Sequence, residues 1–247
     1  MVGAYELIIL WASVIASLAA VGVCVYYKSF LRYLWLNFYL LSNVLFTVGC
    51  YYVYSVYGYE SRQYFYFYYI GDALPNIVGY LLIGSFVDRM LRASIFRQYI
   101  RPTMLIFFLL VMGISGLFVS GGLERVRVFP RFVIEFEQNM YFVGVLLTFL
   151  LWISMSYLLA ESRRFVLLIS GLGIYFSAHA ANYAMRFLFR DPDLATILTK
   201  VPPLAYTFMV LLWLYTFWRV PEGEPMVELA GQPQGRESLV KVQISRE

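Results

Sequence analysis

Charged residues are scarce in this chain. Asp, Glu, Lys and Arg together make up 14% of its 247 residues, whereas 61% of the residues are hydrophobic and the mean hydropathy is +0.69. A soluble domain carries about 25% charged residues. This shortage excludes a soluble enzyme domain, a disordered chain and a coiled coil. It predicts an all-α membrane protein that crosses the bilayer several times.

Cysteine and histidine are also rare. The two cysteines, Cys24 and Cys50, are too few for a disulfide framework or a thiolate metal site. The single histidine, His179, excludes bis-histidine haem ligation and the zinc motifs that need two histidines. Lys200 lies too near the end of an apolar run to hold retinal as a Schiff base, and no serine or cysteine lies in a recognisable catalytic motif. We therefore expect no catalytic residues, no metal and no cofactor.

Basic residues are missing from the N-terminal segment, which carries Glu6 instead. A signal peptide begins with a basic region, so we expect the first apolar run to be a membrane span. A hydrocarbon core of about 30 Å needs about 20 helical residues. The runs that meet this length are 5–27, 34–58, 64–88, 102–121, 133–160, 165–188 and 195–218.

These runs predict a seven-helix transmembrane domain over residues 1–219 and a short polar tail over residues 220–247. The tail carries three prolines, and 13 of its 28 residues are charged or polar, as in mobile segments. Residues 123–139 fit a loop, an interfacial helix or an early start to the fifth span, and the sequence leaves these alternatives open.

The basic residues are distributed unevenly between the two sides of the membrane. Twelve of the 19 Lys and Arg residues lie on the side that carries the C-terminus, and seven lie on the other side. Cytoplasmic segments carry the excess of Lys and Arg. The distribution predicts an outside N-terminus and an inside C-terminus. It also assigns the formal net charge of +4 to the membrane surface, so we expect no nucleic-acid partner.

Small residues recur at four-residue spacing on two spans, where they let helix backbones approach closely. They are Ala12, Ala16 and Ala20 in the first span, and Gly173, Ser177 and Ala181 in the sixth. Packing inside the bundle and formation of a homo-oligomer both fit these stripes.

A tyrosine-rich hairpin between the second and third spans is the most unusual local feature. Nine of the 22 tyrosines lie within residues 51–69. One interpretation is an aromatic belt at the headgroup layer. The other is a docking surface for another membrane protein or a lipid-like ligand, because rings on every face of the hairpin cannot all lie in that layer. The rings expected to face a partner are Tyr54, Tyr57, Tyr59 and Tyr64.

Polar side chains gather in the predicted outer half of the bundle. Ionisable groups are costly inside a bilayer and mark candidate functional sites. The candidates are Asp72, Asn76, Glu137, His179, Asn182 and Arg186. Asp72 is the deepest acid, and we predict that spans three and six are in contact, with Asp72 bonded to His179, Asn182 or Arg186. Structural pairing between helices, a ligand cavity open to the outside, a proton or ion pathway and catalysis are the possible roles of the cluster.

The start of the third span resembles a known sequence pattern. Residues 64–74 read Tyr-Phe-Tyr-Phe-Tyr-Tyr-Ile-Gly-Asp-Ala-Leu, and Gly79 follows. This segment is similar to the pattern Tyr-Phe-Tyr-x-Tyr-Trp-x-x-x-Ala-Leu-x-x-x-x-Gly of uncharacterised seven-span membrane proteins of acidobacteria. Tyr69 departs from it, because the pattern has Trp there. The resemblance implies a bacterial inner membrane and assigns no activity and no residue roles.

Two classes of function follow from these patterns. In the first, the chain is a non-enzymatic bacterial inner-membrane module, a sensor or an accessory subunit of a complex. It would bind a partner protein or a small ligand at its outer aromatic and polar residues. In the second, the chain is a small transporter or channel that uses the same polar residues. Transporters are built from repeats with broken helices, and Pro75 and Pro202 do not form an obvious repeat pair. We favour the first class.

Overall fold

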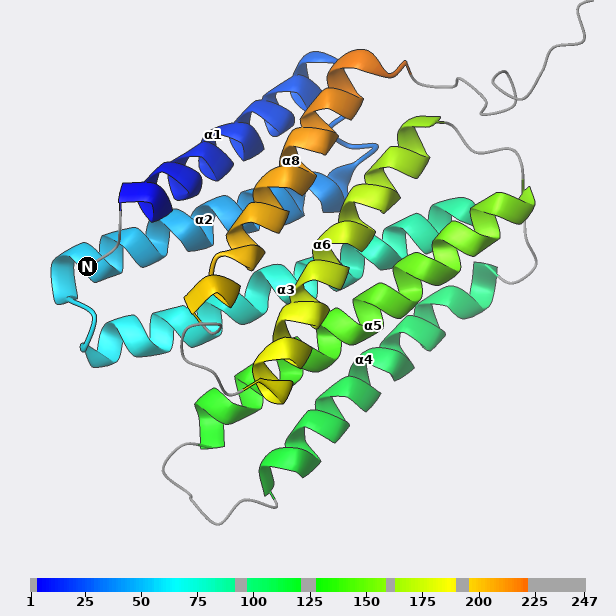
Figure 1. Cartoon of the computed structure of the whole chain (residues 1–247). Coiled ribbons are helices and arrows are strands. Elements are labelled where there is room, and N and C mark those ends of the chain that lie inside the picture. Colours follow the sequence, from blue (N-terminus) through cyan, green and yellow to red (C-terminus); the bar gives the residue numbers. More distant parts are fainter. Residues whose placement is uncertain (1–3, 92–96, 121–127, 159–162, 190–195, 222–247) are drawn as a thin grey trace, which may run out of the picture.

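The computed structural model describes residues 4–91, 97–120, 128–158, 163–189 and 196–221, and the long elements of these residues are all α-helices (Figure 1). They are α1 (Ala4–Tyr26), α2 (Leu34–Tyr57), α3 (Arg62–Met90), α4 (Arg97–Ser120), α5 (Val128–Leu158), α6 (Arg163–Leu188) and α8 (Val201–Arg219). Each of the seven is long and apolar enough to cross a membrane. The predicted all-α class with seven spans is confirmed.

Two helices begin earlier than their apolar runs. α4 begins at Arg97, and α5 begins at Val128, so that part of the uncertain segment 123–139 is the first part of α5. Arginine side chains can lie along apolar surface while their charged heads reach the interface. The helices therefore continue past the apolar core into charged sequence. The predicted tail lies outside the described residues from position 222 onward.

The turn between α2 and α3 follows from two residues with special backbone roles. Gly58 takes φ = +78°, a conformation that side chains with a Cβ rarely adopt, and its N–H still bonds the carbonyl of Tyr54. Ser61 then caps α3, because its hydroxyl accepts the backbone N–H of Tyr64 at 3.1 Å. The tyrosine-rich hairpin is therefore a tight turn between two long helices.

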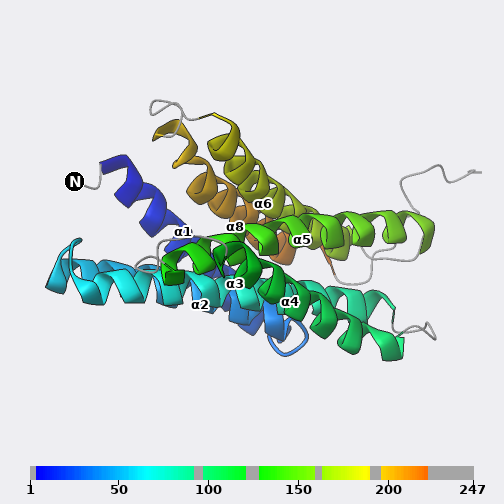
Figure 2. The same cartoon turned by 90° about the horizontal axis from the view of Figure 1, so that it is seen from below.

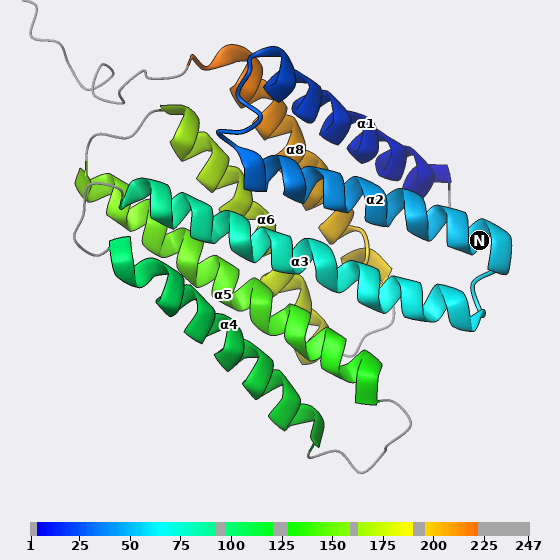
Figure 3. The same cartoon turned by 180° about the vertical axis from the view of Figure 1, so that it is seen from behind.

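Six of the helices pack in a closed ring. In the order α1, α2, α3, α5, α6 and α8, each helix packs against the next, and α8 packs back against α1. α4 lies outside this ring, mainly on α5, and it touches α3 only lightly (Figure 3). Because α5 is inserted between α3 and α6, these two helices are not neighbours in the ring.

The two ends of the ring differ in packing. We name the end where α1 begins the N-end, and the opposite end, where α8 ends, the C-end. The largest fully buried side chains lie in the middle of the bundle or in its C-end half, among them Trp213, Tyr39, Phe165 and Leu168. Toward the N-end, α1, α6 and α8 diverge from α2 and α3 (Figure 2).

The small-residue stripe of α1 follows this difference in packing. Ala16 and Ala20 are buried, whereas Ala12, nearer the N-end, is exposed. Helix backbones approach closely only where such residues meet a neighbour. The stripe is therefore used for packing inside the ring in its C-end part. Ser177 and Ala181 of the second stripe are exposed.

The direction of the bundle in the membrane follows from its charges, and a reporter fusion can measure it. Basic residues favour the cytoplasmic side, so we expect the C-end to be cytoplasmic. A reporter that is active only in the cytoplasm, fused after Glu247, should be active. Activity of an export-dependent reporter at the same position would reverse the orientation.

Candidate functional site

The polar centre of the N-end half is a pair of carboxyl groups. α3 and α5 both begin at the N-end, and Asp72 and Glu137 lie ten and nine residues after their first residues. At a rise of about 1.5 Å per residue, both carboxyls are about 14–15 Å from the helix starts. Since α3 and α5 are neighbours, the two carboxyl groups lie close enough to interact electrostatically.

Tyrosines surround this carboxyl pair. Tyr183 of α6 donates its phenolic hydrogen to Oε2 of Glu137 at 3.3 Å. Tyr68 lies one turn before Asp72 on α3, and Tyr141 lies one turn after Glu137 on α5. All three phenols are in electrostatic range of both carboxyls. We name Asp72, Glu137, Tyr68, Tyr141 and Tyr183 the acid–tyrosine cluster.

His179 extends the acid–tyrosine cluster toward the ring interior. Its imidazole stacks on the Tyr141 ring, with centroids 4.2 Å apart and an interplanar angle of 21°. It also contacts the ring of Tyr175 at 4.5 Å, and the hydroxyl oxygens of Tyr141 and Tyr175 are 3.4 Å apart. The histidine is therefore held between aromatic rings rather than against an acid.

The carboxyl pair has no basic partner among the described residues. Neither Asp72 nor Glu137 forms an ion pair with a lysine or arginine of the described segments, and Oε1 of Glu137 receives no hydrogen from a described donor. Glu137 is 4% exposed, while Asp72 is half-buried and accessible in part. Two acids therefore lie close together in the bundle interior, and Asp72 keeps part of its surface exposed.

The predicted partner of Asp72 is wrong. Its side-chain partner is Glu137 of α5, not His179, Asn182 or Arg186 of α6. The reason is the ring order, in which α3 packs mainly against α5. α3 meets α6 through the rings of Phe86 and Phe165, 5.3 Å apart and fourteen residues beyond Asp72 on α3. Arg186 is also too shallow, because it lies two residues before the end of α6 and its side chain is exposed.

The two predicted asparagines lie outside the acid–tyrosine cluster. Asn76 is buried, and its amide donates to the backbone carbonyl of Asp72 in its own helix at 3.2 Å. Asn182 is 4% exposed, and its Oδ1 has no hydrogen-bond partner among the described residues. Of the six predicted polar residues, the structure thus brings Asp72 and Glu137 together directly and His179 to them through Tyr141.

The predicted partner-facing aromatics form a separate group at the tip of the α2–α3 hairpin. The ring of Tyr64 is 6.0 Å from that of Tyr54 and 5.4 Å from that of Tyr59. Tyr57 and Tyr59 are exposed, at 53% and 73%. The group fits an aromatic belt and a docking surface equally well.

The tyrosines that line the carboxyl pair are not among the predicted site residues, although a spacing signal for them exists. Tyr68 and Asp72 are four residues apart, as are Glu137 and Tyr141, and Tyr175, His179 and Tyr183 continue the same spacing on α6. Residues four apart share a helix face. These stripes of alternating aromatic and ionisable residues on three helices therefore predict that their side chains meet in the same part of the bundle interior.

The donor set of the cluster suits an organic cation better than a metal ion. Among the described residues, no three His, Cys, Asp or Glu side chains come together as metal ligands. Calcium takes six to eight oxygen ligands, and the carboxyl pair supplies at most four. Phenol rings, in contrast, stabilise a neighbouring ammonium group through their faces.

Comparison of the chain with protein-family models, with curated proteins and with solved structures finds no match in any of the three. The resemblance of residues 64–79 to acidobacterial proteins accordingly identifies no family. The seven long apolar helices make the chain a multi-pass membrane protein in contact with the lipid bilayer.

Proposed function

We propose that this chain is a non-enzymatic membrane module that binds a small organic cation at its acid–tyrosine cluster. The observation that carries the proposal is the pair of facing carboxyls, Asp72 and Glu137, with phenols around them and no described basic side chain in ion-pair contact. The ligand would enter from the N-end, the predicted outer side, where the helices diverge.

The electrostatics of the pair favour a positive occupant. Two neighbouring ionised carboxylates repel strongly when water is excluded. The repulsion is removed by a shared proton or by a cation between the oxygens. The rings of Tyr68, Tyr141 and Tyr183 add a cation–π attraction of about 0.5–2 kcal/mol each to an organic ammonium. A proton gains nothing from these ring faces, whereas an ammonium group gains from every one of them.

The packing of the C-end half supports binding rather than passage through the membrane. Trp213, Tyr39 and Phe165 fill the ring interior on that side, each with less than 2% of its surface exposed. A transporter or channel needs a polar route to the second side. The polar groups of the cluster, in contrast, lie only in the N-end half.

We further propose that another protein chain, bound at the N-end, detects whether the acid–tyrosine cluster holds its ligand. The exposed tyrosines at the tip of the α2–α3 hairpin adjoin α3, the helix that carries Asp72, and they offer rings for a partner protein. The resemblance of residues 64–79 supports the bacterial inner membrane as the location.

A calorimetric and thermal titration tests the cation site. Choline, an organic ammonium, is added to the detergent-purified protein at constant ionic strength, and its neutral isostere 3,3-dimethylbutan-1-ol is added in parallel. We expect choline to raise the unfolding midpoint and the isostere to leave it unchanged. Glu137→Gln should weaken choline binding at least tenfold, about 1.4 kcal/mol, because it removes one of the two charges.

Glu135→Gln is the matched control, since Glu135 lies on the same helix two residues earlier, on a different face. Its choline affinity should equal that of the unaltered protein. The proposal fails if the isostere stabilises the protein as much as choline does. It also fails if the variants at positions 135 and 137 behave alike, or if Glu137→Gln raises the midpoint and no cation binds, because the pair then holds a shared proton.

A further inference from the structure

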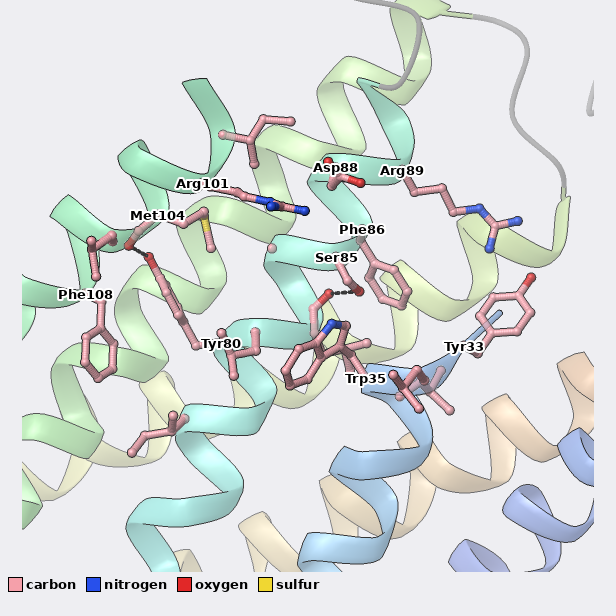
Figure 4. Close-up of a pocket in the computed structure, with 18 of the residues that line it drawn as sticks. Tyr33, Trp35, Tyr80, Ser85, Phe86, Asp88, Arg89, Arg101, Met104 and Phe108 are labelled. Atoms are coloured by element: carbon pink, nitrogen blue, oxygen red, sulfur yellow. Dashed lines mark hydrogen bonds between the residues drawn. The ribbon is translucent and has the colours of Figure 1, made fainter. Parts of the chain in front are cut away.

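A cavity lies at the end of the molecule opposite to the acid–tyrosine cluster, between α2, α3 and α4. Its volume is about 750 Å³, within the range of ligand sites. It exists because α4 stands outside the ring and touches α3 only lightly. Its side chains are drawn in Figure 4. The sequence alone does not predict this cavity, because the cavity depends on where α4 packs.

The deep part of the cavity is apolar, and a hydrogen bond there joins α3 to α4. The hydroxyl of Tyr80 on α3 donates to the backbone carbonyl of Met104 on α4 at 2.6 Å, and the ring of Phe108 lies 5.9 Å from the Tyr80 ring (Figure 4). Along α3 the lining extends from Arg89 to Ile77. The twelve residue steps between them span about 18 Å of helix, which is about the depth of one leaflet of the hydrocarbon core.

The mouth of the cavity is basic. Arg32, Arg89 and Arg101 line it, and Asp88 is the one acid among the described residues of the lining. Asp88 is already paired, because Arg97 contacts its carboxylate at 3.2 Å.

Two of the arginines at the mouth, Arg89 and Arg101, differ in what their side chains contact. Arg89 lies over the rings of Tyr33 and Phe165, at 5.0 and 5.3 Å, whereas the Arg101 side chain points from α4 toward α3 (Figure 4). Arg101 is exposed and forms no ion pair with a described residue.

The walls of the cavity are open to the bilayer rather than to water. Leu81 and Leu105 are 40% and 59% exposed, and Trp35 is 40% exposed, within helices that span the membrane. An occupant therefore needs an apolar body at membrane depth and an anionic head at the C-end interface. Arginine binds phosphate oxygens in pairs through its planar fork.

We propose that this cavity binds an anionic glycerophospholipid of the leaflet at the C-end. One acyl chain lies between α3 and α4 down to Tyr80, and the phosphate contacts Arg101 at the mouth. Basic pockets between spanning helices on the cytoplasmic side are suited to such headgroups. The site is separate from the acid–tyrosine cluster, so it stands or falls independently of the proposed function.

Lipid binding to the purified full-length protein tests this site. Dioleoyl phosphatidylglycerol is titrated in mild detergent and counted by native mass spectrometry, with dioleoyl phosphatidylcholine as the zwitterionic reference. We expect one tightly retained phosphatidylglycerol and no retained phosphatidylcholine. Arg101→Gln should weaken retention about fivefold, the contribution of one basic residue at a membrane surface. Arg163→Gln, an exposed arginine at the same end outside the cavity lining, should leave retention unchanged.

A second pair of variants separates the groove from surface charge. Ser85→Phe puts a ring into the cavity and keeps every arginine, so it should abolish retention. Ser55→Phe is its control, since Ser55 is an exposed serine on α2 away from the cavity. Equal retention by Arg101→Gln and Arg163→Gln overturns the proposal. So does unchanged retention by Ser85→Phe, or full competition by free glycerol phosphate, which would indicate a soluble phosphate ligand.

Discussion

Replacing Trp213 by Ala is expected to lower the free energy of unfolding by about 3–5 kcal/mol, the range for a buried Trp-to-Ala truncation. Trp213 is completely buried, and its Nε1–H donates to the backbone carbonyl of Leu168 at 2.9 Å. Its ring also packs edge-on against Tyr39, with centroids 6.0 Å apart. The truncation therefore leaves a large cavity where α8, α6 and α2 meet, and it removes the side-chain hydrogen bond that joins α8 to the backbone of α6.

Denaturant unfolding in detergent measures this effect, and two variants isolate its causes. Trp213→Phe retains a ring and loses the hydrogen bond, so it should fall between Trp213→Ala and the unaltered protein. Trp218→Ala is the control, because Trp218 lies on the same helix and is 65% exposed. Its effect should stay within about 0.5 kcal/mol. Equal losses at positions 213 and 218 would mean that the ring interior at the C-end does not hold the bundle together.

The seven spans could be predicted because each membrane helix is specified by its own residues. A run of about 20 apolar residues must be helical in a bilayer, where every backbone group has to bond within its own segment. The ends were less predictable. α4 begins at Arg97 and α5 at Val128, several residues before the apolar runs. Arginines in the first turn of a helix place their charges in the polar interface, so the helix can extend beyond its apolar core.

The neighbours of each helix could not be predicted, and the error at Asp72 shows why. Depth along a helix follows from the sequence, so Asp72 and Glu137 were correctly placed in the same half. The order in which the helices pack side by side does not follow from the sequence. Lipid tails are as apolar as leucine, so hydrophobicity gives an apolar helix face no preference for one neighbouring helix over another. The ring places α5 beside α3, and the partner of Asp72 is therefore a second acid on α5 instead of a base on α6.

Arg164 is one of the twelve basic residues on the side that the sequence predicts to be cytoplasmic, and the structure gives it a packing role. It is 6% exposed, while the adjacent Arg163 is exposed. Its guanidinium Nε donates to the backbone carbonyl of Val220 at 2.9 Å, and its carbon Cζ lies 5.6 Å from the centre of the Phe217 ring. The last carbonyls of a helix lack partners within the helix and carry partial negative charge. Arg164 on α6 thus closes the end of α8.

Arg164→Ala is expected to lower the free energy of unfolding by about 2–4 kcal/mol, because it removes charged hydrogen bonds and the packing of the side chain. Arg163→Ala, the neighbouring exposed arginine, should change it by no more than about 0.5 kcal/mol. Arg164→Lys keeps the charge but loses the planar fork that donates from two nitrogens, so it should recover only part of the loss. Denaturant unfolding in detergent distinguishes the three variants. If Arg164→Ala and Arg163→Ala cost the same, the bond to Val220 does not hold the end of α8, and the arginine serves only as a surface charge.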